Sequence, residues 1–192
     1  MLKLIAKKSL RRTLRWIKLR RQKIVAHTIV SKANRINLCC GSRKLPDFCN
    51  IDISTDADLV LDLEKTLLPF RDNQCEIVIC ISAINYFSRQ RGLQIIKDAH
   101  RILEPGGVAR FATQDLRLIA QKYIKYDKDF FFQKLVSGKD RFEGETIGDK
   151  FNSWFYGYKT SGGKYCKYFY DFESLALLFK KAGFTMVEKK DI

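Results

Sequence analysis

The stretch that decides the fold is Arg35-Ile36-Asn37-Leu38-Cys39-Cys40-Gly41-Ser42, and Asn50-Ile51-Asp52-Ile53 follows it closely. A short apolar strand leads into a glycine turn, and a second apolar strand ends on a lone carboxylate. The glycine lets backbone amides approach a ligand, and the carboxylate can accept both hydroxyls of a ribose. The pair is typical of an α/β fold that binds a nucleoside cofactor.

Each half of this pattern also has an ordinary interpretation. Gly41 can serve only as a turn, and Asp52 can be a helix cap or part of a surface turn. The interval between them is shorter than the roughly 20 residues of the general dinucleotide pattern. That pattern by itself therefore does not cover this chain.

Beyond residue 35, short apolar runs alternate with helical periodicity, which indicates an α/β sheet. Within the run at 76–82, residues 77–81 are all apolar, as expected of a strand covered on both faces. Strands are predicted at residues 36–40, 48–53, 59–61, 76–82, 108–113 and 184–189. Helices are predicted at residues 89–103, 116–126, 130–136 and 171–182.

The positive charge of the chain is concentrated at its start. The 192 residues carry a net charge of +15, and residues 1–35 hold 12 of the 36 Lys and Arg and no acid. The remaining 24 basic and 21 acidic residues give the rest of the chain a net charge of only +3. This near balance argues against a domain built as a whole for nucleic acid.

The basic segment at residues 1–34 is predicted to be an amphipathic N-terminal helix, because Leu10, Leu14, Ile17 and Ile24 can share one face. Four interpretations stay open. The helix can lie on an anionic membrane surface, bind RNA phosphates, act as an organellar transit peptide, or pack as a solvated helix on the domain.

The cysteines favour a reducing compartment. No pair has the CxxC spacing, and the first residues lack the continuous apolar core of a secretory signal. We expect free thiols in a cytoplasmic protein and no metal site. The six are Cys39, Cys40, Cys49, Cys75, Cys80 and Cys166.

The run from Asn37 to Asp52 resembles the Leu-Asn-Leu-Gly-Cys-Gly opening of a bacterial branch of small class I S-adenosylmethionine (SAM) dependent methyltransferases, the methyltransferase type 11-like branch. That branch has the same short crossover. The resemblance keeps its order over about residues 35–190. Its further matches are Asp62-Leu63-Glu64-Lys65, Leu68-Pro69-Phe70-Arg71-Asp72-Asn73, the 100–107 turn, Gln114-Asp115-Leu116, Tyr170-Asp171-Phe172-Glu173-Ser174-Leu175 and Ala182-Gly183-Phe184.

The resemblance implies a Rossmann-like, mostly parallel sheet over residues 35–192 with SAM as its cofactor. The loop of Cys39, Cys40, Gly41 and Ser42 would pass under the methionine part. Asp52 would hold the ribose, and Ile53 would pack on the adenine. The pair Asp62 and Leu63 would flank the adenine ring, and the pair Ser82 and Ala83 would border the sulfonium.

The departures from the family pattern bear on catalysis. Cys39 replaces the usual glycine, Ile84-Asn85-Tyr86 stands where Leu-Glu-His is common, and Cys166 takes the place of a histidine. A catalytic histidine is therefore not expected. The candidates are Asp115 as a base and Tyr86 as an orienting hydroxyl. Asp115 can equally be the N-cap of the helix that follows it.

Two further segments carry expectations. The aromatic stretch at 151–158 can form a lid over an acceptor or an aromatic layer on the sheet edge. Family members usually end with a sixth strand and an antiparallel seventh. Because the predicted strand 184–189 is followed only by residues 190–192, the final strand is expected to be missing.

These features predict methyl transfer to a small molecule or a glycan precursor. Bacterial relatives of this branch are often associated with surface polysaccharide synthesis, which suits a cytoplasmic enzyme at the inner membrane face. Two alternatives remain: an RNA methyltransferase guided by the basic tail, and a catalytically inactive scaffold with a SAM-type fold. The oligomeric state is left open.

Overall fold

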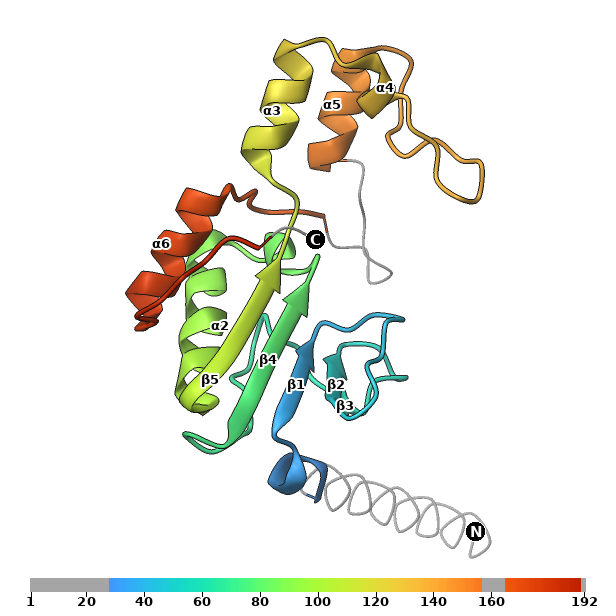
Figure 1. Ribbon diagram of the computed structural model, residues 1–192. Helices are drawn as coiled ribbons and strands as arrows, with labels where there is room; N and C mark the ends of the chain where they lie inside the picture. The colour runs from blue at the N-terminus through green and yellow to red at the C-terminus, as the bar shows by residue number, and fades with distance from the viewer. Residues whose placement is uncertain (1–27, 157–164, 191–192) are drawn as a thin grey trace, which may run out of the picture.

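The computed structural model describes residues 28–156 and 165–190. Its centre is a sheet with the strand order β3-β2-β1-β4-β5, in which every pairing is parallel (Figure 1). The predicted α/β class and parallel sheet are confirmed. The strands are β1 (Arg35–Leu38), β2 (Cys49–Asp52), β3 (Leu59–Val60), β4 (Cys75–Ile81) and β5 (Leu103–Ala112).

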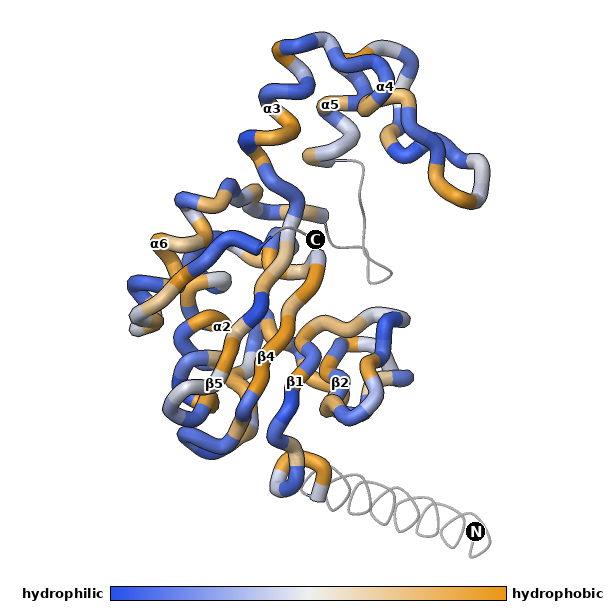
Figure 2. The backbone as a smooth tube through the Cα atoms, in the orientation of Figure 1, coloured by the Kyte–Doolittle hydropathy of each residue, from blue (hydrophilic) through white to orange (hydrophobic). Residues whose placement is uncertain are grey.

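The main core lies between this sheet and two helices. In Figure 1, α2 (Arg89–Ile102) and α6 (Phe172–Ala182) lie together on one side of the sheet. Ser88 begins α2 by accepting a hydrogen bond from the Arg91 N–H, and Gly183 ends α6 in the left-handed conformation that a C-cap favours. Figure 2 shows that β4 is apolar along most of its length, as predicted for a central strand.

A second, separate core is built from aromatic residues above the carboxyl ends of the strands. We call residues 116–156 the cap. It contains α3 (Leu116–Ile124), α4 (Lys128–Phe131) and α5 (Ile147–Tyr156). The buried residues of this core are Ile119, Phe131, Phe142, Ile147 and Trp154.

The cap corrects one expectation. The helix predicted at 130–136 is wrong, because α4 stops at Phe131 and an antiparallel bridge between Lys134 and Asp140 follows. The described part of the aromatic stretch belongs to the separate core of the cap, and its role as a lid over an acceptor stays a prediction. Most of it belongs to α5, where Trp154 is 1% exposed and packs on Phe155 and Phe169.

The strand predicted at 184–189 is also wrong, since residues 184–190 form no strand. A strand buries alternate residues, but here the half-buried positions are Phe184 and Val187, three residues apart. Met186, which would share the face of Phe184 in a strand, is 74% exposed. Among the described strands, β5 is thus the edge of the sheet.

Of the basic helix predicted at residues 1–34, the first 27 residues lie outside the described part of the chain. Residues 28–32 are helical, and Ile29, Val30 and Ala33 pack against the main core. The Gln74 side-chain amide fixes this end by donating to the carbonyls of Val30 and Ala33 at 2.6 and 2.8 Å. In the ranges that the structure describes, no helix has the length and apolarity to cross a bilayer.

Candidate active site

A pocket of about 260 Å³ opens at the carboxyl ends of β1, β2 and β4. Parallel strands bring the loops that follow them to one edge of the sheet, and ligands of open α/β sheets bind there. The pocket is lined by Cys39, Gly41, Ile51, Asp52, Ile53, Leu61, Asp62, Leu63, Ser82, Ala83, Tyr86 and Phe87. A second hollow, on the cap, is lined only by Lys128, Asp129 and Phe132.

The structure brings together eight of the ten residues predicted from the sequence to contact the cofactor, together with Tyr86. Cys40 is buried behind the glycine turn, and Ser42 is exposed on it; neither lines the pocket. Sequence reasoning missed three apolar lining residues. Each of them is next to a predicted site residue in the sequence. Apolar residues beside predicted site residues were therefore the signal that could have identified them. They are Ile51, Leu61 and Phe87.

Asp52 ties the two halves of the opening motif together. One carboxylate oxygen accepts a hydrogen bond from the Gly41 N–H at 3.0 Å, and the other accepts from the Ser54 N–H at 2.9 Å. The acid therefore fixes the glycine turn after β1 against the end of β2. A carboxylate oxygen has two lone-pair sites, so each oxygen keeps one acceptor position for a ligand.

Two residues in the pocket wall have left-handed backbones although they are not glycine. Cys39 follows β1 with φ of 53°, and Ser82 follows β4 with φ of 56°. Such residues cost roughly 1–2 kcal/mol each, because Cβ approaches the following carbonyl. They bend the chain sharply where the two adjacent strands end. Strained residues of this kind gather at binding sites.

The opposite wall is held from helix α2. Asp62 accepts the Glu64 N–H at 3.0 Å, which forms a tight turn around Leu63. The Arg91 guanidinium then donates to the carbonyls of Leu63 and Thr66. Leu63 is 4% exposed, so this wall presents a fixed apolar surface next to one carboxylate.

Tyr86, at the end of the 3-10 helix η1 (Ile84–Tyr86), belongs to a polar cluster beside the pocket. Asn85 is 5% exposed, and its side-chain amide donates to the Cys166 sulfur at 2.8 Å. The Asn85 carbonyl accepts the backbone N–H groups of Lys167 and Tyr168. Burial raises the pKa of the Cys166 thiol, so Cys166 is neutral at pH 7 and is not a thiolate base.

Asp115 does not line the pocket. One of its oxygens accepts the N–H groups of Arg117 and Leu118 as the N-cap of α3, and the other lies 3.1 Å from the Lys189 Nζ. The structure thus shows the capping role that the sequence left as the alternative. The catalytic role of Asp115 stays a prediction.

The remaining titratable groups do not form a metal site. Within residues 28–156 and 165–190, no cluster of three or more His, Cys, Asp or Glu is arranged to hold a metal. The six cysteines are free thiols, and burial raises the pKa of Cys49 to about 12 and that of Cys75 to about 11. His100 lies away from the pocket, edge-on against Phe184.

Comparison with known proteins agrees with this geometry. Residues 30–111 match a family model described as a methyltransferase domain. No curated protein matches the chain. The stretch that matches begins just before β1 and ends one residue before the end of β5, so it contains β1 to β4, nearly all of β5 and all of the pocket.

Solved structures are similar only distantly. One belongs to the complex between the Trm112 methyltransferase activator of Haloferax volcanii and a methyltransferase, at 15% identity and a TM-score of 0.44, covering 85% of this chain and 69% of that one. Another is a protein from Pyrococcus horikoshii, at 18% identity and a TM-score of 0.44, covering 83% and 77%. The parallel sheet, its pocket and the family match identify residues 30–111 as a class I methyltransferase domain, an enzyme domain whose cofactor is S-adenosylmethionine.

Proposed function

We propose that the pocket binds SAM and that the chain transfers its methyl group to a small molecule or a glycan precursor. The observation that carries the proposal is Asp52, whose carboxylate braces the Gly41 turn while keeping one free acceptor position on each oxygen. Two adjacent acceptors match the two hydroxyls of a ribose.

The other walls fit the rest of a nucleoside. Ile53 and Leu63 lie on the apolar side of the pocket, and Asp62 supplies an acceptor for an exocyclic amine. Gly41 has φ of 52°, and no atom lies within 4 Å of the position that its Cβ would take, so the turn leaves open space. The volume of about 260 Å³ is close to the lower end of the roughly 300–1,000 Å³ of ligand sites.

When bound, SAM supplies a methyl group on a positively charged sulfur, which is open to in-line displacement. The protein's contribution is then to orient the acceptor and exclude water. Ser82 and Ala83 form the wall at the end of β4, next to Tyr86. We propose that the Tyr86 hydroxyl orients the acceptor, because Tyr86 lines the pocket whereas Asp115 does not.

We further propose that the enzyme acts at the inner face of a membrane, with residues 1–34 on anionic lipid. The 12 basic residues and no acid in residues 1–35 support this. Exchanging the basic residues of positions 7–23 for glutamine in the full chain should strongly reduce sedimentation with anionic vesicles. Unchanged sedimentation would end the idea, and RNA binding with a steep salt dependence would favour the RNA alternative.

Calorimetric titration of SAM tests the cofactor site. The parent should bind at one site, and Asp52→Ala should weaken binding by about 100-fold, the loss expected when about 3 kcal/mol of charge-assisted hydrogen bonding disappears. Asp56→Ala is the control, since Asp56 is an exposed acid nearby that does not line the pocket. Equal binding by parent and Asp52→Ala would refute the ribose assignment.

A further inference from the structure

Residues 133–141 of the cap form an ordered hairpin. Arg141 donates its N–H to the Gln133 carbonyl at 2.9 Å, and Leu135 donates to the Lys139 carbonyl at 2.8 Å. The turn closes with Gly138, which has φ of 78° and donates to the Leu135 carbonyl at 2.8 Å. Residues 135–138 are therefore a held turn at the end of a projecting loop, as Figure 1 shows.

This turn exposes two adjacent aliphatic side chains. Leu135 is 51% exposed and Val136 is fully exposed at 111%. Single exposed apolar residues are ordinary on protein surfaces, but here two consecutive ones occupy the tip of a hydrogen-bonded turn. Phe132, at the start of the loop, is 45% exposed as well. The tip is convex, so it fits a deformable apolar medium better than it fits a flat partner.

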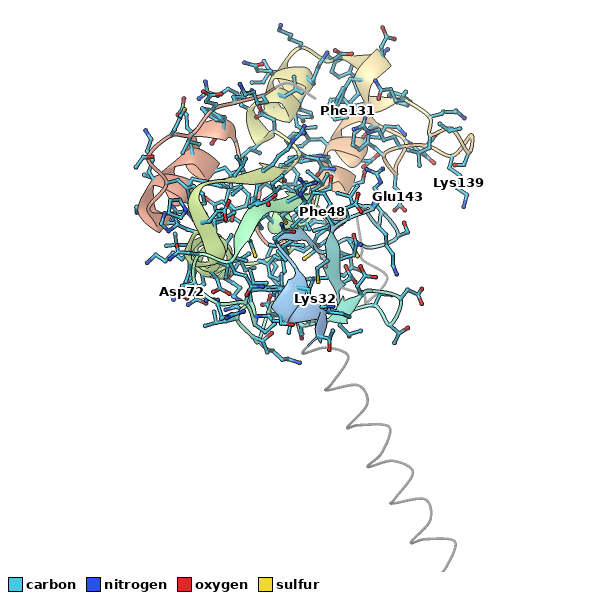
Figure 3. The ribbon with its side chains drawn as sticks, turned by 60° about the horizontal axis from the view of Figure 1, so that its bottom comes forward. Lys32, Phe48, Asp72, Phe131, Lys139 and Glu143 are labelled. Atoms are coloured by element: carbon cyan, nitrogen blue, oxygen red, sulfur yellow. The ribbon has the colours of Figure 1, made fainter. Side chains whose placement is uncertain are left out.

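The charged side chains next to the tip are lysines. Lys134 and Lys139 flank the aliphatic pair, and the charged group of Lys139 lies at the outer end of the loop in Figure 3. The one acid of the hairpin, Asp140, lies at its base, 3.2 Å from the Nζ of Lys150 and 3.6 Å from that of Lys134, whose side chain is still 67% exposed. Aliphatic residues between cations are complementary to a bilayer surface that carries anionic headgroups.

The base of the hairpin is fixed to the cap core. Phe142 is 1% exposed, and its carbonyl accepts a hydrogen bond from the Lys150 ammonium at 2.9 Å. That ammonium also lies 4.6 Å from the centre of the Phe132 ring. Because the base is already ordered, little conformational entropy is lost when the tip meets a partner.

We propose that the hairpin is a lipid-binding element that inserts Leu135 and Val136 into the headgroup region of an anionic membrane, with Lys134 and Lys139 at the level of the phosphates. This contact is separate from the basic segment at the start of the chain. It does not depend on the cofactor pocket.

Vesicle sedimentation of the full chain tests the proposal. With vesicles of equal parts phosphatidylglycerol and phosphatidylcholine, the double variant Leu135→Ser/Val136→Ser should show an approximately ten-fold lower partition coefficient than the parent. The control is Val60→Ser/Leu67→Ser, which makes the same two substitutions at exposed residues of the sheet half, 54% and 61% exposed. An equal loss in both variants would contradict a specific hairpin contact.

A fluorescence measurement covers the case in which the basic segment alone holds the protein on the vesicle. The Trp of Val136→Trp should shift its emission to the blue on adding these vesicles, beyond the change seen in Leu67→Trp and in the parent. Pure phosphatidylcholine should give a smaller shift, because the flanking lysines lose their anionic partners. The absence of any excess shift at position 136 would overturn the proposal, and binding by a protein pocket would then be the better explanation of the tip.

Discussion

The sheet half of the molecule, residues 35–112, and the cap are built on different principles. The core of the sheet half is mainly aliphatic and comes from α2 and from paired strands, whose Ile36 and Val78 are both at 0% exposure. The cap instead gathers phenylalanine and tryptophan side chains from short helices around a buried lysine. The pocket lies in the sheet half. The family match ends at residue 111, before the cap begins at residue 116.

The methyltransferase family model matches the sheet half but does not extend to the cap. The sheet half carries the pocket and the residues proposed to hold the cofactor, which lie at strand ends that the parallel topology fixes. The cap carries the exposed hairpin and the aromatic core, and it lies above the same strand ends (Figure 1). The proposed cofactor site thus lies in the sheet half, and the proposed lipid contact lies in the cap.

The largest effect should come from emptying the cap core. Trp154→Ala removes a side chain that is 1% exposed and should cost about 3–5 kcal/mol. If the two cores are independent, the near-ultraviolet dichroism of the cap collapses while SAM affinity stays within about three-fold. Ile96→Ala in the main core is the comparison and should weaken SAM binding while the near-ultraviolet dichroism of the cap is kept. Loss of SAM binding with Trp154→Ala alone would show that the two halves form one cooperative unit.

The next effect concerns the buried lysine of the cap. Lys150→Met keeps the aliphatic stem but leaves the Phe142 carbonyl without its donor, at a cost of about 1–3 kcal/mol in urea denaturation. Substitution of both Lys150 and Asp140, by Met and Asn, should cost no more than Lys150→Met alone. A larger loss of stability in the double variant would contradict the assignment of Lys150 as the main partner of Asp140.

The same pair predicts a pH dependence. The hydrogen bond from Lys150 holds the pKa of Asp140 below its usual range. The stability from this pair is therefore present above about pH 4, the pKa of an unfolded aspartate, and is lost as the pH falls through the lower folded pKa. Lys150→Met should flatten the acid limb of the stability curve of the cap. A limb of unchanged slope would mean that other acids dominate it.

A smaller effect is expected at the junction of the two halves. Asp115→Ala removes the N-cap of α3 and should cost about 1 kcal/mol in thermal or urea unfolding. SAM affinity should stay unchanged, since Asp115 does not line the pocket. Asp115→Ser, which can still cap, should recover most of the stability. A catalytic base would instead lose turnover in Asp115→Ser as completely as in Asp115→Ala.

The smallest effect is a gain. Cys39→Gly relieves a left-handed residue at roughly 1–2 kcal/mol, and the added freedom of the unfolded chain returns roughly 0.5–1 kcal/mol of that. The expected net gain is about 0.5 kcal/mol, together with tighter SAM binding because the pocket loses a side chain. Cys40→Gly is the control, because Cys40 has no positive φ and does not line the pocket. A loss of stability in Cys39→Gly would show that the packing of its thiol outweighs the strain.

The sequence predicted the sheet half well because its signals are local. The segments that became β1, β2 and β4 are rich in apolar residues, and the glycine turn and Asp52 stand at the ends of β1 and β2. The cap was predicted poorly because its order depends on contacts between distant residues. Phe131, Phe142 and Trp154 meet only in three dimensions, and α4 is too short to show a helical period.

The predicted sixth strand failed for a related reason. The segment at 184–189 has the composition of a strand, but Phe184 is drawn onto His100 and Phe179. These contacts leave Met186 outside, so the period of two that strand formation needs is not satisfied. The sequence did not carry this information, because Phe184 and Met186 have the spacing of a strand and only the contacts of Phe184 in the folded chain exclude one.

Hydrogen–deuterium exchange of the full chain, with and without saturating SAM, tests the division of labour between the two halves most directly. We expect SAM to slow exchange in residues 39–43, 52–54, 61–64 and 82–87, which surround the pocket, and to leave α3 and α5 nearly unchanged. Protection confined to the cap, or no protection at all, would contradict the assignment of the cofactor site to the sheet half.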